Sequence, residues 1–350
     1  MNLFDLWMGT SQGIQGASGA AGAAGIALQL AIIIIKVAVI VGVLMVHVTW
    51  ATYFERKTIG HMQVRLGPMR VGPHGFLQPI ADFIKLFFKE DVIPASADKP
   101  VFFVAPVISI FATMSAVAVI PIFSGFEIAD INIGLLYILA MSSLSAYGVI
   151  MAGWASNSKY SFLGGLRSSA QVISYEVAMG LSLVGVMMMA GSLNLTEIVK
   201  AQQKYPLGIF AIPQILGFFV FMVSAFAETN RTPFDLPEAE SELVAGYFTE
   251  YSGMRFALFY VAEYIGMIGM SLVAITCFLG GWTGPFHIPY VPFAWLLIKL
   301  YLMIFLFYWV RATVPRYRYD QLMKLGWKFL IPLALFNIVL TGAVKLLVKA

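Results

Sequence analysis

Residues 26–50 read IALQLAIIIIKVAVIVGVLMVHVTW, and Lys36 is the only Lys, Arg, Asp or Glu among them. An α-helix rises about 1.5 Å per residue, so this run is long enough to cross the roughly 30 Å hydrocarbon core of a bilayer. Lipid also excludes charge, which agrees with the composition of the run. We therefore expect residues 26–50 to form a transmembrane helix.

Seven more apolar runs of similar length follow the first one. They lie near residues 101–123, 131–154, 169–191, 207–227, 256–280, 291–311 and 327–347. Of the 350 residues, 60% are hydrophobic and only 11% are charged, which excludes a soluble globular protein, a disordered chain and a collagen. The sequence therefore predicts an all-α polytopic membrane protein, with eight transmembrane helices in one membrane domain over residues 26–350.

The segment before the first apolar run has a different composition. Residues 1–25 are rich in Gly and Ala and contain no Lys or Arg, so they lack the charged start of a signal peptide. We expect a loose N-terminal tail and assign it no function.

The chain offers few residues for a redox centre. Cys277 is the only cysteine, so the chain cannot form an internal disulfide, ligate an iron–sulfur cluster or supply a four-cysteine zinc site. The four histidines show no metal-ligand spacing, and no nucleotide-binding glycine motif is present. We expect this chain to bind no cofactor, and any redox centre to belong to a partner. The scattered basic residues fit lipid headgroups better than nucleic acid.

The positive charges are unevenly divided between the predicted loops. Segments 51–100, 155–168, 228–255 and 311–328 hold 16 of the 22 Lys and Arg residues. With eight crossings these four segments lie on one side of the membrane, and the positive-inside rule assigns that side to the cytoplasm. We therefore expect both termini on the opposite side and the long, motif-rich loops in the cytoplasm.

One cytoplasmic segment has the pattern of an amphipathic helix. Within residues 76–90, the apolar side chains Phe76, Ile80, Phe83, Ile84, Phe87 and Phe88 recur at helical spacing opposite Asp82, Lys85 and Lys89. Such a helix lies in the membrane interface. A membrane-surface anchor is its simplest function, and it could also form the floor of a lipid-accessible cavity.

A basic segment directly follows the first predicted helix. It begins with Glu55-Arg56-Lys57 and continues through Gly67-Pro68, Gly72-Pro73 and Gln78-Pro79, whose breaks forbid a regular helix. At membrane depth, irregular backbone persists only when it is buried in protein or lines a cavity. The segment is therefore either the mouth of a cavity or an ordinary basic loop that binds lipid headgroups.

Four ionisable residues fall within the predicted spans. Glu176 and Glu263 each lie about seven residues into a span, so both are roughly 10 Å below the same cytoplasmic boundary. Lys36 and Lys299 lie nearer the middle of their spans. Because an unpaired charge in hydrocarbon costs several kcal/mol, each residue is a functional candidate. For the two lysines, snorkelling or a structural ion pair remains as open as a transport role.

Carboxylates concentrate on the cytoplasmic side between residues 228 and 263. They are Glu228, Asp235, Glu238, Glu240, Glu242, Glu250 and Glu263, and Arg231 and Arg255 are the only basic residues among them. Crowded anions disfavour one another's ionisation, which suits carboxylates that pass protons. Alternatively, Pro237 begins a helix and the acids near it stabilise the helix dipole. That alternative does not account for Glu228, Glu250 and Glu263.

Several of these segments resemble the H-subunit family of bacterial NADH:quinone oxidoreductase, respiratory complex I, a family that includes mitochondrial subunit 1. The resemblance covers nearly the whole chain and rests on the motifs Glu55-Arg56-Lys57, Gly67-Pro68, Gly72-Pro73, Ala81-Asp82-Phe83-Ile84-Lys85, Gly153-Trp154-Ala155-Ser156-Asn157, Ile173-Ser174-Tyr175-Glu176, Glu228-Thr229-Asn230-Arg231-Thr232-Pro233-Phe234-Asp235, Glu240-Ser241-Glu242 and Pro315-Arg316-Tyr317-Arg318-Tyr319-Asp320.

The resemblance implies a respiratory-chain translocase subunit of the bacterial inner membrane, with both termini periplasmic and no catalysis in isolation. By resemblance, the quinone-chamber residues are Arg56, Arg65, Arg231, Phe234 and Asp235. The residues implied to couple quinone reduction to proton translocation are Glu176, Glu228, Glu240, Glu242, Glu250 and Glu263.

The implied partners are the hydrophilic quinone-module and iron–sulfur subunits, small membrane subunits and antiporter-like subunits, together with lipids. In this family, quinone is the substrate, and iron–sulfur clusters, FMN and NADH are held by partner subunits.

Two other functions remain as alternatives. A secondary transporter could use Glu176 and Glu263 to bind a coupling ion, but residues 1–175 and 176–350 show no clear internal similarity, which inverted repeats would require. The related membrane subunit of an energy-converting hydrogenase would lack a quinone chamber, and the motifs in residues 51–85 and 228–242 argue against it.

Overall fold

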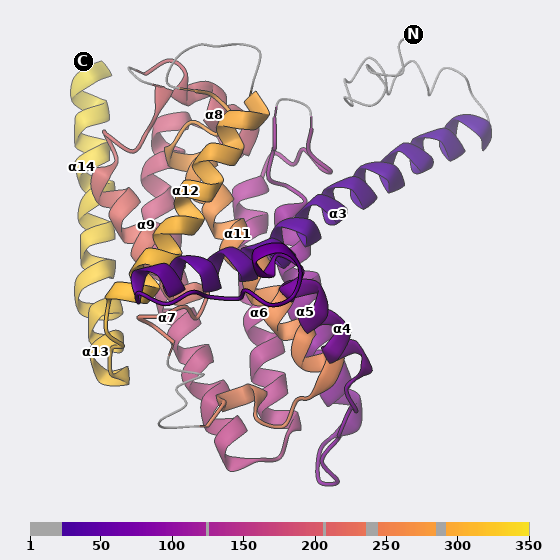
Figure 1. Ribbon diagram of the computed structural model, residues 1–350. Coiled ribbons are helices and arrows are strands. Elements are labelled where there is room, and N and C mark those ends of the chain that lie inside the picture. Colours follow the sequence, from indigo (N-terminus) through magenta and orange to yellow (C-terminus); the bar gives the residue numbers. More distant parts are fainter. Residues whose placement is uncertain (1–22, 124–125, 206–207, 236–243, 285–291, 350) are drawn as a thin grey trace.

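A computed structural model of the chain describes residues 23–123, 126–205, 208–235, 244–284 and 292–349. All regular secondary structure in these ranges is helical (Figure 1). The longer helices are α3 (Ala23–Met62), α4 (Gln78–Phe88), α5 (Lys99–Val117), α6 (Gly134–Ala155), α7 (Lys159–Ala190), α8 (Leu195–Gln202), α9 (Ile215–Glu228), α11 (Gly253–Phe278), α12 (Pro292–Thr313), α13 (Tyr319–Lys324) and α14 (Ile331–Lys349). Shorter turns are η1 (Pro73–Gly75), η3 (Gly246–Phe248) and the π-helical η4 (Leu325–Leu330).

Seven helical segments are long and apolar enough to cross a membrane. They are Leu30–Met62, Lys99–Val117, Gly134–Ala155, Lys159–Ala190, Gly253–Phe278, Pro292–Thr313 and Tyr319–Leu347. The remaining predicted span, 207–227, corresponds to α9, which is apolar but has only 14 residues. The all-α polytopic membrane fold is therefore confirmed, and a helix lies at each of the eight predicted positions.

The first helix is longer than its apolar run. We predicted an end near residue 50, but α3 continues to Met62. The interpretation of Glu55, Arg56 and Lys57 as part of an irregular loop was therefore wrong, because all three lie within the helix. The chain has no proline between the apolar run and Pro68, so nothing forces the helix to end where the hydrophobicity does.

Other helix boundaries differ for related reasons. Helix α7 begins at Lys159, ten residues before the predicted span at 169–191, so most of the predicted loop 155–168 is helical. Helix α9 begins at Ile215 instead of residue 207, because a bend at residue 210 and turns at residues 211–214, which include Pro213, precede it. Hydropathy locates the part of a helix that suits lipid, whereas helices continue into polar sequence at their ends.

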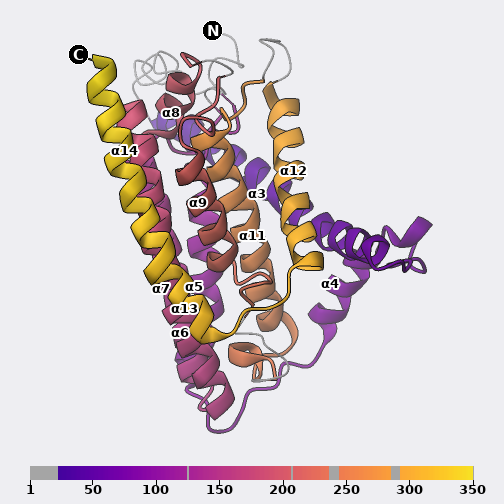
Figure 2. The same cartoon turned by 90° about the vertical axis from the view of Figure 1, so that its left-hand side faces the viewer.

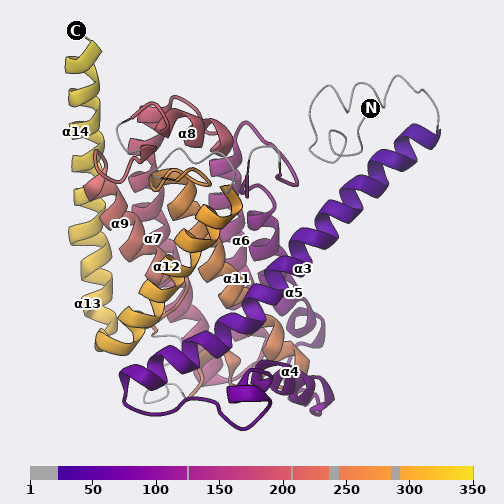
Figure 3. The ribbon, with the colours of Figure 1, turned by 45° about the horizontal axis from the view of Figure 1, so that its top comes forward.

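Helix α11 lies at the centre of the bundle. In its most apolar stretch 72% of the residues are buried, compared with 17% for the first span. Figure 2 shows α9 and α11 between α14 on one side and α12 on the other. Helix α3 crosses this bundle obliquely, and its N-terminal half stands away from the other helices (Figure 3). The C-terminal half of α3 is the part that packs on the core, through buried Leu44, Val48 and Ala51.

The predicted amphipathic helix is present as α4. Its apolar residues Ile80, Phe83, Ile84 and Phe87 are exposed, as expected of a helix that faces lipid. On its other side, Asp82 forms an ion pair with Arg56 of α3, with 2.6 Å between Nη1 and Oδ2.

The chain after α4 is attached to the beginning of α11. The backbone N–H of Val92 donates to Ser252 Oγ at 3.0 Å, and Arg255 Nη2 lies 2.9 Å from Asp91 Oδ2. Gly253 has φ +54°, and a Cβ atom there would lie 3.1 Å from the Lys89 carbonyl oxygen. Glycine therefore permits both the left-handed backbone and the close approach. Together with the Arg56–Asp82 pair, these contacts tie α4 to both α3 and α11.

Candidate functional site

A buried carboxylate joins four separate parts of the chain. Glu55 of α3 is 4% exposed and accepts hydrogen bonds from Tyr264 Oη of α11 at 2.6 Å and from Arg231 Nη1 at 3.3 Å. Arg311 of α12 also donates to it. The extension of α3 beyond its apolar run is what carries Glu55 to this position.

Arg231 connects Glu55 to a second buried carboxylate. Its Nε atom lies 2.8 Å from Glu263 Oε1, and its guanidinium carbon lies 4.2 Å from the centre of the Tyr264 ring. Burial by itself would lower the pKa of Arg231, but the charges of Glu263 and Glu55 outweigh it and hold this pKa well above its ordinary value. Arg231 therefore keeps its positive charge between the two acids.

The backbone before Arg231 explains how it reaches both acids. Helix α9 ends at Glu228, and Asn230 adopts a left-handed conformation with φ +48°. Asparagine is one of the few residues with a side chain that commonly adopts this conformation. The turn at Asn230 directs the chain back toward the bundle, where Arg231 is only 5% exposed.

A large polar cavity lies on one side of this cluster. It has a volume of about 450 Å³ and is lined by Glu55, Arg56, Ile59, Gln63, Arg65, Thr232, Tyr260, Tyr264, Arg311 and Arg316. The structure therefore brings the predicted chamber residues Arg56 and Arg65 together on one cavity. The lining is rich in guanidinium and phenol groups, which donate hydrogen bonds to carbonyl oxygens.

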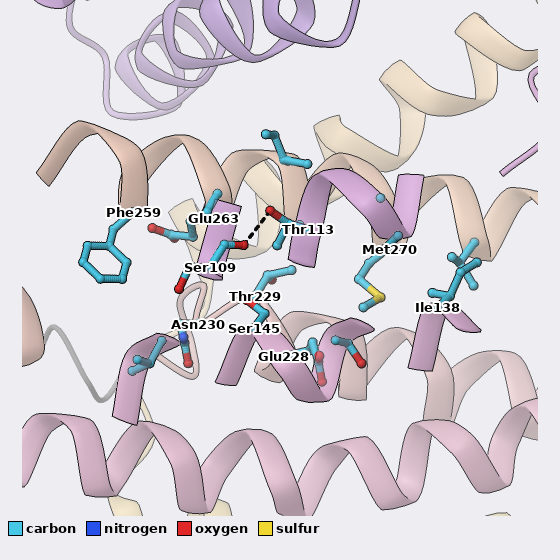
Figure 4. A pocket seen from close by; sticks show the side chains of 18 of the residues that line it. Ser109, Thr113, Ile138, Ser145, Glu228, Thr229, Asn230, Phe259, Glu263 and Met270 are labelled. Carbon is cyan, nitrogen blue, oxygen red and sulfur yellow. Dashed lines mark hydrogen bonds between the residues drawn. The ribbon is translucent and has the colours of Figure 1, made fainter. Parts of the chain in front are cut away.

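A smaller cavity lies on the other side of the cluster. It has a volume of about 90 Å³, and its lining includes the acids Glu228 and Glu263 together with Thr229 and Asn230. Figure 4 shows both carboxylates around this cavity with the hydroxyl residues Ser109, Thr113 and Ser145. A water molecule needs roughly 10–15 Å³ of such volume, so the cavity has room for several.

Helix α11 faces both cavities because adjacent helical residues point about 100° apart. Tyr260 and Tyr264, one turn apart and joined by a 3.0 Å hydrogen bond, line the large cavity. Glu263 lines the small cavity. Arg231 contacts Glu263 on one side and Glu55 on the other, so it links the linings of the two cavities.

Glu176 lies next to the small cavity without lining it. It accepts hydrogen bonds from Ser143 and from Ser142 Oγ, the latter at 3.1 Å, and Ser142 lines the cavity. Glu228 also lies close enough to interact with both Glu176 and Ser142. The predicted acids Glu176, Glu228 and Glu263 therefore occur together around one cavity.

The remaining predicted chamber residues lie outside the large cavity's lining. Asp235 forms an ion pair with Arg316, a lining residue, at 3.1 Å. Phe234 is 4% exposed and packs between the rings of Tyr175 and Tyr317, at centroid distances of 5.6 and 5.7 Å. Its contacts are those of a packing residue that holds the loop.

Of the other predicted coupling acids, the structure describes only Glu250. Glu250 is half-buried after η3 and lines neither cavity. Glu240 and Glu242 lie outside the described residues.

The two intramembrane lysines have different surroundings. Lys299 Nζ donates to the backbone carbonyls of Leu279, Gly281 and Thr283 at 2.5, 2.9 and 2.5 Å. These contacts fix the C-terminal end of α11, so the structure favours a structural role for Lys299. Lys36 is buried, and Glu127 is near enough for its charge to act on the ammonium group.

Sequence analysis missed three contributors to the cluster. Tyr264, Tyr260 and Arg311 were not singled out, although Tyr264 is adjacent to Glu263 and Arg311 ends a predicted span. Their partners lie far away in sequence: 209 residues separate Tyr264 from Glu55, and 256 separate Arg311 from Glu55. No local pattern reveals such contacts.

Comparison with known proteins identifies the family of the chain. The family model described as NADH dehydrogenase matches residues 35–342. The chain is 54% identical to the NADH-quinone oxidoreductase H subunit of Paramagnetospirillum magneticum, over 90% of this chain and 93% of that protein. The H subunit of Rickettsia typhi is also 54% identical, over 90% of this chain and 94% of that protein. An H subunit of Geobacter sulfurreducens is 51% identical, over 88% of this chain and 93% of that protein. The chain therefore belongs to the H-subunit family of NADH-quinone oxidoreductase and is a multi-pass membrane subunit of respiratory complex I.

Proposed function

We propose that this subunit forms part of a quinone-binding chamber and of an acidic conduit that couples quinone reduction to proton translocation. The observation that carries the proposal is the position of Arg231. It contacts Glu55, which lines the 450 Å³ cavity, and Glu263, which lines the 90 Å³ cavity. In this proposal, a change of charge in the large cavity alters the electrostatic potential at the acids that line the small cavity.

The large cavity suits the polar headgroup of a quinone. Reduction of a quinone to a quinol takes up two electrons and two protons at its two carbonyl oxygens. Arg56 and Arg65 provide N–H donors for such oxygens. In this proposal the electrons come from NADH through FMN and iron–sulfur clusters of partner subunits, since this chain has a single cysteine.

The acids respond to the reaction through electrostatics. At an effective dielectric constant of about 20, a change of one unit charge at about 8 Å is worth roughly 2 kcal/mol. That energy is enough to change the proton occupancy of a carboxyl group whose two states lie close in free energy. The change of charge acts first on Glu55 and then, through Arg231, on Glu263. Glu228 and Glu176 respond next, because they lie around the same small cavity.

The distribution of charge supports a cytoplasmic position for the large cavity. Arg56, Arg65, Arg311 and Arg316 line it and belong to the basic side of the membrane. We propose that this side faces the cytoplasm of a bacterium and the hydrophilic quinone-module and iron–sulfur subunits. Both termini would then be periplasmic, and the small membrane and antiporter-like subunits would contact the spans.

Replacement of Glu263 by Gln tests the proposal. The variant keeps the shape of the side chain but cannot release a proton, so we expect the assembled complex to lose quinone-dependent proton translocation. The assay measures quinone reduction by NADH and acidification of inverted membrane vesicles, both normalised to the amount of assembled complex. The exposed acid Glu197 of α8 provides the matched control, Glu197→Gln, which should behave as wild type. Wild-type translocation in Glu263→Gln would refute the proposal.

A further inference from the structure

A buried glutamine holds both ends of the segment that carries Arg231. Gln171 of α7 is completely buried. Its Nε2 atom donates to the carbonyl oxygens of Ala227 and Phe234, each at 2.8 Å, and lies 3.3 Å from Asn230 Oδ1. Two carbonyls that are seven residues apart are thus fixed to one amide nitrogen. Gln171 therefore closes residues 227–234 into a compact loop.

This loop forms part of the wall between the two cavities. Glu228, Thr229 and Asn230 line the small cavity, and Thr232 lines the large one. Arg231, between them, reaches the acids on both sides. A shift of the loop by a fraction of an ångström would change the distances from Arg231 to both acids, because the whole segment moves with its ends.

We propose that Gln171 is a positioning residue for coupling, which fixes the loop 227–234 so that Arg231 contacts Glu55 and Glu263 together. This inference rests on the proposed function of the two cavities. Gln171 itself touches neither cavity and exchanges no proton.

The test uses Gln171→Met, which retains the length of the side chain and removes its donors. The chain supplies a matched control in Gln202, another completely buried glutamine that holds backbone groups. Gln202 Nε2 donates to the Thr276 carbonyl at 2.6 Å, and its Oε1 accepts from Gly280 N–H at 2.8 Å. These contacts lie at the opposite end of α11 from Arg255, and neither Thr276 nor Gly280 lines either cavity.

Both variants are measured in the full complex in membrane vesicles. We expect Gln171→Met to lower the number of protons translocated per NADH oxidised by about twofold or more, because two hydrogen bonds that hold the loop are lost. NADH oxidation with ferricyanide, which does not require quinone, should stay unchanged per assembled complex. Gln202→Met should leave the proton ratio unchanged, even if less complex is assembled. A wild-type ratio in Gln171→Met, or an equal loss in Gln202→Met, would overturn the inference.

The two single variants separate this inference from the proposed function. Should Glu263→Gln be impaired while Gln171→Met is normal, only the positioning role fails. Should Glu263→Gln translocate protons normally, the proposed function fails whatever Gln171→Met does.

Discussion

The middle and the C-terminal end of α11 both bury polar groups, but the two regions satisfy them differently. In the middle, Glu263 and Tyr264 contact Arg231 and Glu55, which are ionisable side chains beside the two cavities. Just after the C-terminal end, three backbone carbonyls accept hydrogen bonds from Lys299. A charge fixed by backbone dipoles can only hold the helix in place. A charge fixed by other ionisable groups can change when one of its neighbours gains or loses a proton.

The largest expected effect comes from removing the cation beside the middle of α11. Arg231→Met leaves Glu55 and Glu263 buried without this partner, which typically costs about 3–5 kcal/mol. We expect loss of quinone reduction together with a lower yield or lower denaturation temperature of the complex. The amount of assembled complex in membranes gives the yield, and thermal denaturation of the complex gives its denaturation temperature. Normal stability and turnover in Arg231→Met would show that the two acids do not depend on this cation.

Lys299→Met should have a smaller effect of a different kind. It removes the donor shared by three carbonyls at the end of α11. Hydrogen bonds to a charged group contribute about 1.5–3 kcal/mol each, and the cost of desolvating the lysine offsets part of that gain. We expect a lower denaturation temperature but unchanged proton translocation per assembled complex. Loss of translocation with unchanged stability would instead support the transport role that the sequence left open.

Tyr264→Phe makes the smallest change in the ionisable cluster at the middle of α11. It removes the 2.6 Å hydrogen bond to Glu55 while the ring stays in contact with Arg231. A hydrogen bond to a carboxylate is worth about 1.5–3 kcal/mol, so quinone turnover should fall by roughly tenfold if the bond shapes the reacting cavity. Steady-state kinetics with a short-chain quinone measure this change. Phe102→Leu at the ring stack with Tyr251 is a control for aromatic packing elsewhere.

Long apolar runs made most of the fold predictable, because lipid requires about 20 apolar residues for each crossing. The ends of the helices were less predictable. Helix α3 extends to Met62 and α7 begins at Lys159, since polar sequence remains helical outside the apolar core. The amphipathic α4 was predicted correctly, because its pattern is local.

The candidate site was only partly predictable. The resemblance singled out Arg56, Arg65, Arg231, Glu228 and Glu263, which the structure places on or between the two cavities. The central role of Glu55 was missed, because its partner Arg231 is 176 residues away and its neighbours Arg56 and Lys57 resemble a surface loop. The contacts of Gln171 could not be predicted either, because its partners Ala227 and Phe234 are also far away in sequence. Such partnerships arise only when helices pack.

The central claim is that quinone reduction changes the proton occupancy of acids on the far side of Arg231. Redox-induced infrared difference spectroscopy of the assembled complex observes the carbonyl band of protonated carboxyl groups directly. We predict a carboxyl signal on quinone reduction that is lost in Glu263→Gln and retained in the exposed control Glu197→Gln. A carboxyl signal that is identical in wild type and Glu263→Gln, or absent from wild type, would contradict the account.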